Sequence, residues 1–165
     1  MARSGILTAG SKRALDAVAR AALSLAAPDA EARVLDVEAG LGALTLLVAT
    51  KVAHVTAVDA SDAIVKALRA RVAVAKLKNV EARVADPTAL PFVERTFDAV
   101  YLTSVEGARD GVVAELRRVL KPGRPAIVAG RDRDALVEEL TLAGFDDVEA
   151  HDVKSAHAWL AVGIA

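Results

Sequence analysis

The feature of this sequence that most constrains its fold is a glycine-bearing turn near residue 40. Residues 33–37, Arg-Val-Leu-Asp-Val, favour a strand; Glu-Ala-Gly-Leu-Gly follows, and an apolar helical stretch begins near Gly42. Seventeen residues beyond that glycine comes an acid, Asp59. A strand, a glycine turn and a helix in this order bring the backbone close to a nucleotide-like ligand at the carboxyl end of the first strand of an α/β sheet. The turn therefore predicts an α/β fold and the edge of the sheet at which a ligand would bind.

The rest of the chain alternates helix-favouring and strand-favouring segments. Apolar periodicity predicts helices over residues 10–27, 42–50, 61–77, 108–120 and 132–143, and strands over 33–37, 55–59, 80–85, 97–103 and 125–129. Two last β-favouring runs, 146–153 and 156–164, are joined so closely that we expect an antiparallel hairpin. The repeated βαβα order predicts a doubly wound sheet of parallel strands with helices on both faces.

Length and composition narrow the class of protein further. With 165 residues we expect one domain, with an N-terminal helix that can act as a lid over residues 1–29 and a core over residues 30–165. The net charge is −1 with both signs interspersed, so no nucleic-acid partner is indicated. No apolar run is long enough to span a bilayer or to act as a leader, so we expect a cytoplasmic protein without a membrane partner.

The residue types that are scarce are also informative. Cysteine is absent, which excludes disulfides, thiol nucleophiles and cysteine-based metal sites, and the histidines are too scattered to predict a metal site. Hydrophobic residues make up 54% of the chain but aromatic residues only 3%. Small exposed apolar patches are expected from such a composition, and they favour self-association as a homodimer.

The glycine turn has two interpretations. Gly40 and Gly42 allow close backbone approach, and the free N–H groups at the start of the following helix attract polar or anionic ligand groups. As a dinucleotide-binding fingerprint the turn is incomplete, since the third glycine would fall at Thr45. A tight strand-to-helix connection without a ligand explains the same residues.

Two acids follow later predicted strands at the same edge. Asp59 can accept hydrogen bonds from ribose hydroxyls, or it can serve as an acid at the start of a helix. Asp86 can accept a bond from an adenine amino group, or it can cap the turn at Pro87. Ser104 and Glu106 are expected at the mouth of any pocket, where solvation of a loop explains them equally well.

Taken together, an ordered series of segments resembles the class I S-adenosylmethionine-dependent methyltransferases, most closely the group that includes the quinone-biosynthesis C-methyltransferases. The segments that carry the resemblance are residues 34–42, 58–61, 85–86, 90–92, 97–100 and 116–123. The resemblance covers residues 30–165. It implies a Rossmann-like sheet of seven strands in the order 3-2-1-4-5-7-6, with strand 7 antiparallel.

The resemblance also implies a cofactor and its binding residues. In that family the first loop lies against the methionine part of S-adenosylmethionine, the acid after the second strand holds the ribose, and the acid after the third strand meets the adenine. The corresponding residues here are Asp36, Gly40 and Gly42 at the loop, Asp59 and Asp86 as the two acids, and Ala60 and Thr88 lining the adenine cleft. The implied reaction is attack on the sulfonium methyl by an unidentified acceptor, and it depends mainly on positioning and on exclusion of water. No catalytic residue can be named.

Glu38 departs from the family pattern, which has glycine at this position. A glutamate adds bulk and negative charge near the carboxylate of the cofactor, and it strains a loop that requires glycine-like backbone angles. We expect it to weaken cofactor binding, although its carboxylate could instead reach the amino group or sulfonium of the cofactor. The glutamate at this position, together with the short connections between the predicted strands and helices, is typical of a minimal, engineered or degenerate family member.

Two alternatives to a methyltransferase remain. One is a non-catalytic binding module or scaffold with the same fold. The other is a nicotinamide-dependent oxidoreductase, which Thr45 and the later methyltransferase-like segments disfavour.

Overall fold

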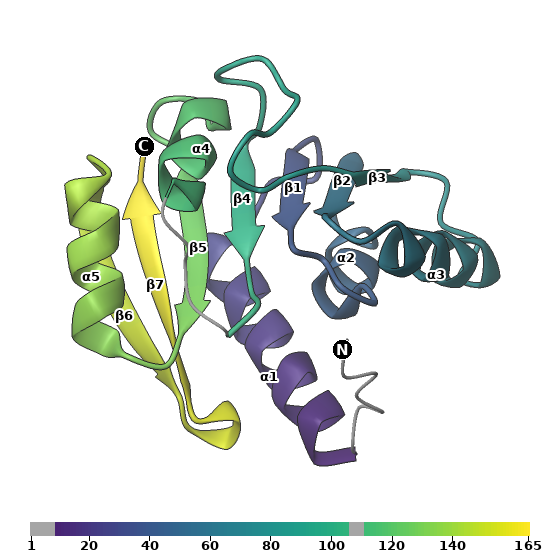
Figure 1. Cartoon of the computed structure of the whole chain (residues 1–165), viewed down its shortest axis with the longest axis horizontal. Helices are drawn as coiled ribbons and strands as arrows, with labels where there is room; N and C mark the ends of the chain where they lie inside the picture. The colour runs from purple at the N-terminus through teal and green to yellow at the C-terminus, as the bar shows by residue number, and fades with distance from the viewer. Residues whose placement is uncertain (1–8, 106–110) are drawn as a thin grey trace.

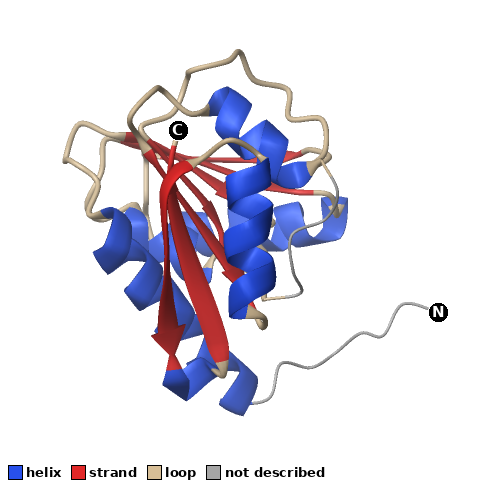
Figure 2. Ribbon diagram, turned by 90° about the vertical axis from the view of Figure 1, so that its left-hand side faces the viewer, coloured by secondary structure: helices blue, strands red, loops and turns tan. Residues whose placement is uncertain are grey.

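The computed structural model describes residues 9–105 and 111–165 as one seven-stranded sheet with helices on both faces (Figures 1 and 2). The helices are α1 (Ala9–Ala26), α2 (Ala43–Val48), α3 (Asp62–Val74), α4 (Val112–Val119) and α5 (Arg133–Leu142), with a short 3-10 helix η1 (Lys154–Ala156). The strands are β1 (Arg33–Val37), β2 (His54–Asp59), β3 (Val80–Val84), β4 (Ala99–Leu102), β5 (Pro125–Gly130), β6 (Asp146–Val153) and β7 (Ala158–Ile164). Glu106 lies outside the described residues.

The strand order is β3-β2-β1-β4-β5-β7-β6, which confirms the predicted topology. β1 is an inner strand and pairs in parallel with β2 and β4. β7 runs antiparallel to both β5 and β6, so the expected terminal hairpin is also confirmed. The carboxyl ends of β1, β2, β3 and β4 therefore meet at one edge of the sheet.

The sheet is covered on both faces because its central strands are apolar on both sides. Val34 packs in a cluster with residues of α1 and α2, whereas its neighbour Leu35 packs in a cluster with residues of α4 and α5. A third cluster joins α3 to β2 and β3. None of the described helices has the length and apolar character needed to cross a membrane.

Several element boundaries differ from those predicted, and three of the differences have a visible cause. β4 begins at Ala99 because Phe97 forms only an isolated bridge with Leu120, and the Asp98 carboxylate bonds the Lys121 ammonium at 2.8 Å. α3 ends at Val74, since Lys76 takes a left-handed conformation with φ 56°. α4 begins at Val112, after Gly111 at φ 87°.

Candidate active site at the carboxyl edge of the sheet

The turn after β1 is fastened to the end of β2. The Ala39 N–H bonds the Val58 carbonyl at 3.0 Å, and the Gly40 N–H donates to Asp59 Oδ2 at 3.1 Å. The other oxygen of Asp59 accepts from the Ser61 N–H at 3.0 Å. Ser61 caps α3 through a bond from the Ile64 N–H, so Asp59 itself does not cap the helix. Asp59 thus holds the glycine turn in place.

The two glycines of the turn have different structural roles. Both have positive φ, 56° at Gly40 and 82° at Gly42. A Cβ atom at Gly42 would lie 2.4 Å from Leu68 Cδ1, so this glycine lets the turn pack against α3. A Cβ atom at Gly40 would have no heavy atom within 4 Å. The backbone at Gly40 is therefore open to an approaching ligand.

Glu38 extends from this turn to the end of the neighbouring strand. Its backbone is left-handed, with φ 55°, a conformation that favours glycine. Its carboxylate accepts a hydrogen bond from the hydroxyl of Ser104, which follows β4. The glutamate at the glycine position is accommodated, but in an unfavourable backbone conformation and with its side chain lying across the strand ends.

A cavity of about 450 Å³ opens beside this contact, a size typical of small-molecule sites. Its wall comes from the turn, α1, α2, α3 and the segment after β4. The lining residues are Lys12, Leu15, Asp16, Glu38, Ala39, Gly40, Leu41, Ala43, Leu44, Arg71, Thr103 and Ser104. The cavity is thus mainly apolar, with charged side chains from three elements at its wall.

Of the predicted binding residues, only Glu38 and Gly40 line this cavity. Asp36 and Gly42 are buried beside it, within the sheet and under α3. The remaining four lie farther along the same edge: Asp59 ends β2 and Ala60 comes next, while Asp86 and Thr88 follow β3.

Asp36 is a fully buried carboxylate on the inner strand β1. Thr45 of α2 donates its hydroxyl to Asp36 Oδ2 at 2.5 Å, while Oδ1 has no partner among the described residues. Burial raises the pKa of Asp36 to about 7, and the nearby charge of Asp59 contributes to the increase. Tyr101 lies beside it in register on β4, and its hydroxyl is likewise buried without a partner in the described part of the chain. Burial, and then the charge of Asp36, raise the pKa of Tyr101 above its usual range.

Asp86 caps the turn that follows it, which is one of the two roles predicted for it from the sequence. Its Oδ1 accepts the Thr88 N–H at 2.8 Å and the Thr88 hydroxyl at 2.7 Å. These two bonds lower the pKa of the exposed Asp86 carboxyl. Asp86, Thr88 and Ala60 are all exposed at the ligand edge, so an adenine-binding role stays a prediction.

The sequence predicted the N-terminal helix as a lid without naming its residues, and it did not predict the contribution of α3 to the cavity. Lys12, Leu15 and Asp16 of α1 line it, and Arg71 of α3 donates to the Leu41 carbonyl. The i, i+4 spacing of Lys12 and Asp16 is a signal for a shared helix face. The sequence does not predict which strand ends lie beside that face of the helix.

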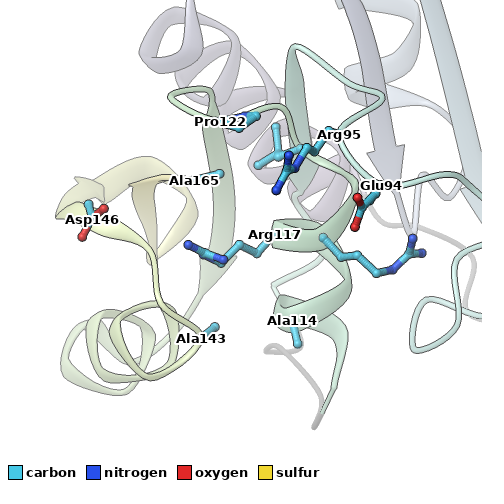
Figure 3. Close-up of a pocket in the computed structure, with 10 residues that line it drawn as sticks. Glu94, Arg95, Ala114, Arg117, Pro122, Ala143, Asp146 and Ala165 are labelled. Carbon is cyan, nitrogen blue, oxygen red and sulfur yellow. The ribbon is translucent and has the colours of Figure 1, made fainter.

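A second cavity, of about 470 Å³, lies at the opposite edge of the sheet, near the start of β5 and the end of β7 (Figure 3). Arg117 and Arg118 line it, and both are engaged in structural contacts. Arg117 donates to the Gly144 carbonyl at 2.7 Å, after α5, and Arg118 pairs with Glu115 at 2.7 Å. This cavity is far from the glycine turn and is not the candidate site.

The described residues also contain no group of three His, Cys, Asp or Glu side chains that could hold a metal ion.

Comparison with known proteins assigns the family. Residues 34–123 match the family model described as "Methyltransferase domain". The demethylmenaquinone methyltransferase of Clavibacter sepedonicus is 40% identical over 106 residues, which cover 62% of this chain and 42% of that protein. The chain spans less than half the length of each curated relative that it matches.

Solved structures agree on the fold. An S-adenosylmethionine-dependent methyltransferase from Aquifex aeolicus superposes with a TM-score of 0.78 at 20% identity, covering 88% of both chains. The [4+2]-cyclase SpnF superposes with a TM-score of 0.77 at 26% identity, covering 86% of this chain and 62% of that one. Because the family model covers more than half of the chain and the strand order agrees, the chain belongs to the methyltransferase domain family, as a class I S-adenosylmethionine-dependent member.

Proposed function

We propose that this domain binds S-adenosylmethionine at the carboxyl edge of the sheet and transfers its methyl group to an acceptor. The observation that supports this most is the geometry of Gly40. Its N–H is held by Asp59, and the space where a Cβ would lie is open beside the cavity. A small-molecule ligand can therefore approach the backbone here without displacing a side chain.

The residues of the chain would have defined roles in this reaction. When bound, S-adenosylmethionine supplies an electrophilic methyl group. Each oxygen of Asp59 accepts one backbone N–H, and each keeps a second lone pair for a ribose hydroxyl. Leu15, Leu41 and Leu44 line the cavity and exclude water from it.

Glu38 limits the affinity in this proposal. Its carboxylate lies in the cavity wall and is bonded to Ser104, so it occupies space at the methionine end of the site and adds negative charge there. Lys12 and Arg71 in the same wall offset part of that charge. Gly40 fits the cofactor, whereas Glu38 fits it poorly, and affinity depends on the balance between them.

Replacing Glu38 by glycine tests this directly. We expect Glu38→Gly to bind S-adenosylmethionine and S-adenosylhomocysteine at least about tenfold more tightly, or about 1.4 kcal/mol, in calorimetric titrations. Glu38→Gln, which removes the charge but keeps the bulk, should fall between the two. Tight binding by the unmodified chain, or no gain with glycine, would contradict the proposed effect of Glu38.

Arg95→Gly is a matched control for this experiment. Arg95 has the same φ of 55°, so the glycine relieves backbone strain equally, but Arg95 does not line the ligand cavity. Arg95→Gly should raise thermal stability without changing affinity for either ligand. An affinity gain in the control would assign the effect to strain alone.

The second candidate is a binding module without methyl transfer, which the Glu38–Ser104 contact across the strand ends favours. Thermal-shift measurements with S-adenosylmethionine, S-adenosylhomocysteine and NAD separate the possibilities. A ligand at a hundred times its Kd raises stability by about 2.7 kcal/mol. A shift with NAD alone would indicate the oxidoreductase, and none with any ligand would indicate a scaffold. The names of the curated relatives make a demethylated quinone the first acceptor to assay with Glu38→Gly.

A further inference from the structure

β3 is an outer strand of the sheet, and no strand among the described residues, 9–105 and 111–165, lies beside its outer edge. The Asn79 carbonyl and the Ala85 N–H bond to β2 and its end, at 2.8 and 3.1 Å. Because bonding groups alternate along a strand, the backbone groups of Val80, Ala82 and Val84 point outward. The Val84 side chain is 48% exposed. Such an edge can accept another strand.

The sequence of β3, Val-Glu-Ala-Arg-Val, is complementary to itself. In antiparallel pairing centred on Ala82, each Val80 lies opposite Val84 of the second copy, and each Glu81 lies opposite Arg83. Glu81 and Arg83 share one face of the strand, where they already form an ion pair at 2.6 Å. Opposite charges and β-branched pairs across strands stabilise a sheet.

The other outer strand, β6, provides a contrast. Its exposed residues include Asp146, Asp147, Glu149 and Asp152, so self-pairing of β6 would bring acidic side chains together. Like charges at a sheet edge oppose association. Of the two outer strands, only β3 suits a second copy of this chain.

A side chain of α3 covers the outward edge of β3. Arg69 donates to the Ala82 carbonyl from both Nε, at 3.0 Å, and Nη2, at 2.7 Å. This carbonyl is the acceptor that a second β3 centred on Ala82 would need. Pairing would also bring two Arg69 guanidinium groups close to the two-fold axis, where they would repel each other.

We infer that β3 is a docking edge for a second copy of this chain and that Arg69 holds this edge closed. Release of Arg69 frees the Ala82 carbonyl and removes a like-charge contact, so two sheets can join through their β3 strands. Arg69 thereby determines whether the domain is a monomer or a dimer. This surface does not include the ligand cavity, and the inference does not depend on the proposed function.

Sedimentation equilibrium of charge variants tests the inference. Arg69→Ala should dimerise at concentrations at which the unmodified chain is monomeric. In the Arg69→Ala background, Glu81→Arg places arginines opposite each other and should weaken the dimer about tenfold. Adding Arg83→Glu restores opposite charges in the reversed order, and should restore the dimer.

Matched variants separate edge pairing from other effects. Arg69→Lys keeps a cation and a donor and should stay monomeric. Glu149→Arg in the Arg69→Ala background makes the same change on β6 and should leave the dimer intact. Hydrogen exchange should show the Ala82 and Val84 amides protected only in the dimer. A monomeric Arg69→Ala protein, or a dimer insensitive to Glu81→Arg, would overturn the inference, and circular dichroism confirms that each variant is folded.

Discussion

At the scale of single residues, the most unusual group is the carboxylate of Asp36 in the middle of the sheet. Burying a charge is costly unless it is fully paired, and only one oxygen of Asp36 accepts a bond within the described residues. The neighbouring Tyr101 hydroxyl is equally unpartnered there. The sequence assigned Asp36 to cofactor binding; the structure places it beneath the turn, bonded to Thr45, and a role toward a ligand stays a prediction.

Asp36 should make stability depend on pH. The unfolded carboxyl titrates near pH 3.8 and the folded one near 7, so between these values the folded state binds more protons. The free energy of unfolding should therefore fall as pH rises through this window, by up to about 1.4 kcal/mol for each pH unit. Asp36→Asn should flatten the profile measured by urea unfolding.

Asp86→Asn is the control for that measurement. The pKa of Asp86 is lowered by its bonds to Thr88, so this carboxylate stays ionised throughout the same window. Its removal should leave the slope between pH 5 and 7 unchanged. An equally steep profile for Asp36→Asn would show that another group titrates.

At the scale of elements, the turn between β1 and α2 combines a packing requirement with an open backbone position beside the cavity. Gly42 is enclosed by Leu68 of α3, whereas Gly40 faces open space. The sequence predicted both glycines as ligand contacts because spacing alone does not distinguish them. Their separate roles become visible only when α3 is in place.

Alanine substitutions should separate these roles. Gly40→Ala places a side chain at positive φ with no clash and should cost about 1 kcal/mol. Gly42→Ala adds a contact 2.4 Å from Leu68 Cδ1 within a packed cluster, and should cost about 3 kcal/mol in urea unfolding. Equal losses at the two positions would argue against the packing requirement at Gly42.

Prediction from sequence worked where local signals coincide with burial. β1 was predicted at its observed bounds because an apolar run ends there at a glycine turn. β4 was predicted too long. At Asp98 a bond to the Lys121 ammonium takes the place of strand pairing, and a local pattern does not predict a contact between residues so far apart in the sequence. The Glu38–Ser104 contact joins residues 66 positions apart, and no local pattern predicts it.

At the scale of the whole molecule, α1 connects the two halves of the sheet. It packs against α2 in the first half and against β5 and β7 in the second. Its buried residues Val18, Ala19 and Ala22 belong to one cluster with strand residues from both halves. Its first turns line the cavity, and the division into a lid over residues 1–29 and a core over residues 30–165 stays a prediction.

Val18→Ala should destabilise the entire domain. Removing two buried methyl groups from this cluster should lower the free energy of unfolding by about 2 kcal/mol. Fluorescence of Trp159 on β7 and far-UV circular dichroism should shift together, because one cooperative unit is affected. Ser24→Ala, on the exposed face of α1, should change neither signal, and separate transitions would contradict a single unit.

The position of β7 has a consequence for biosynthesis. β7 lies between β5 and β6, and β6 pairs with no other strand in the part of the chain that the structure describes. During translation, β6 leaves the ribosome before β7, the strand that attaches it to the rest of the sheet. The nascent chain therefore carries an unattached acidic strand until residues 158–164 emerge, and a premature stop before Ala158 would remove one strand and leave a second detached.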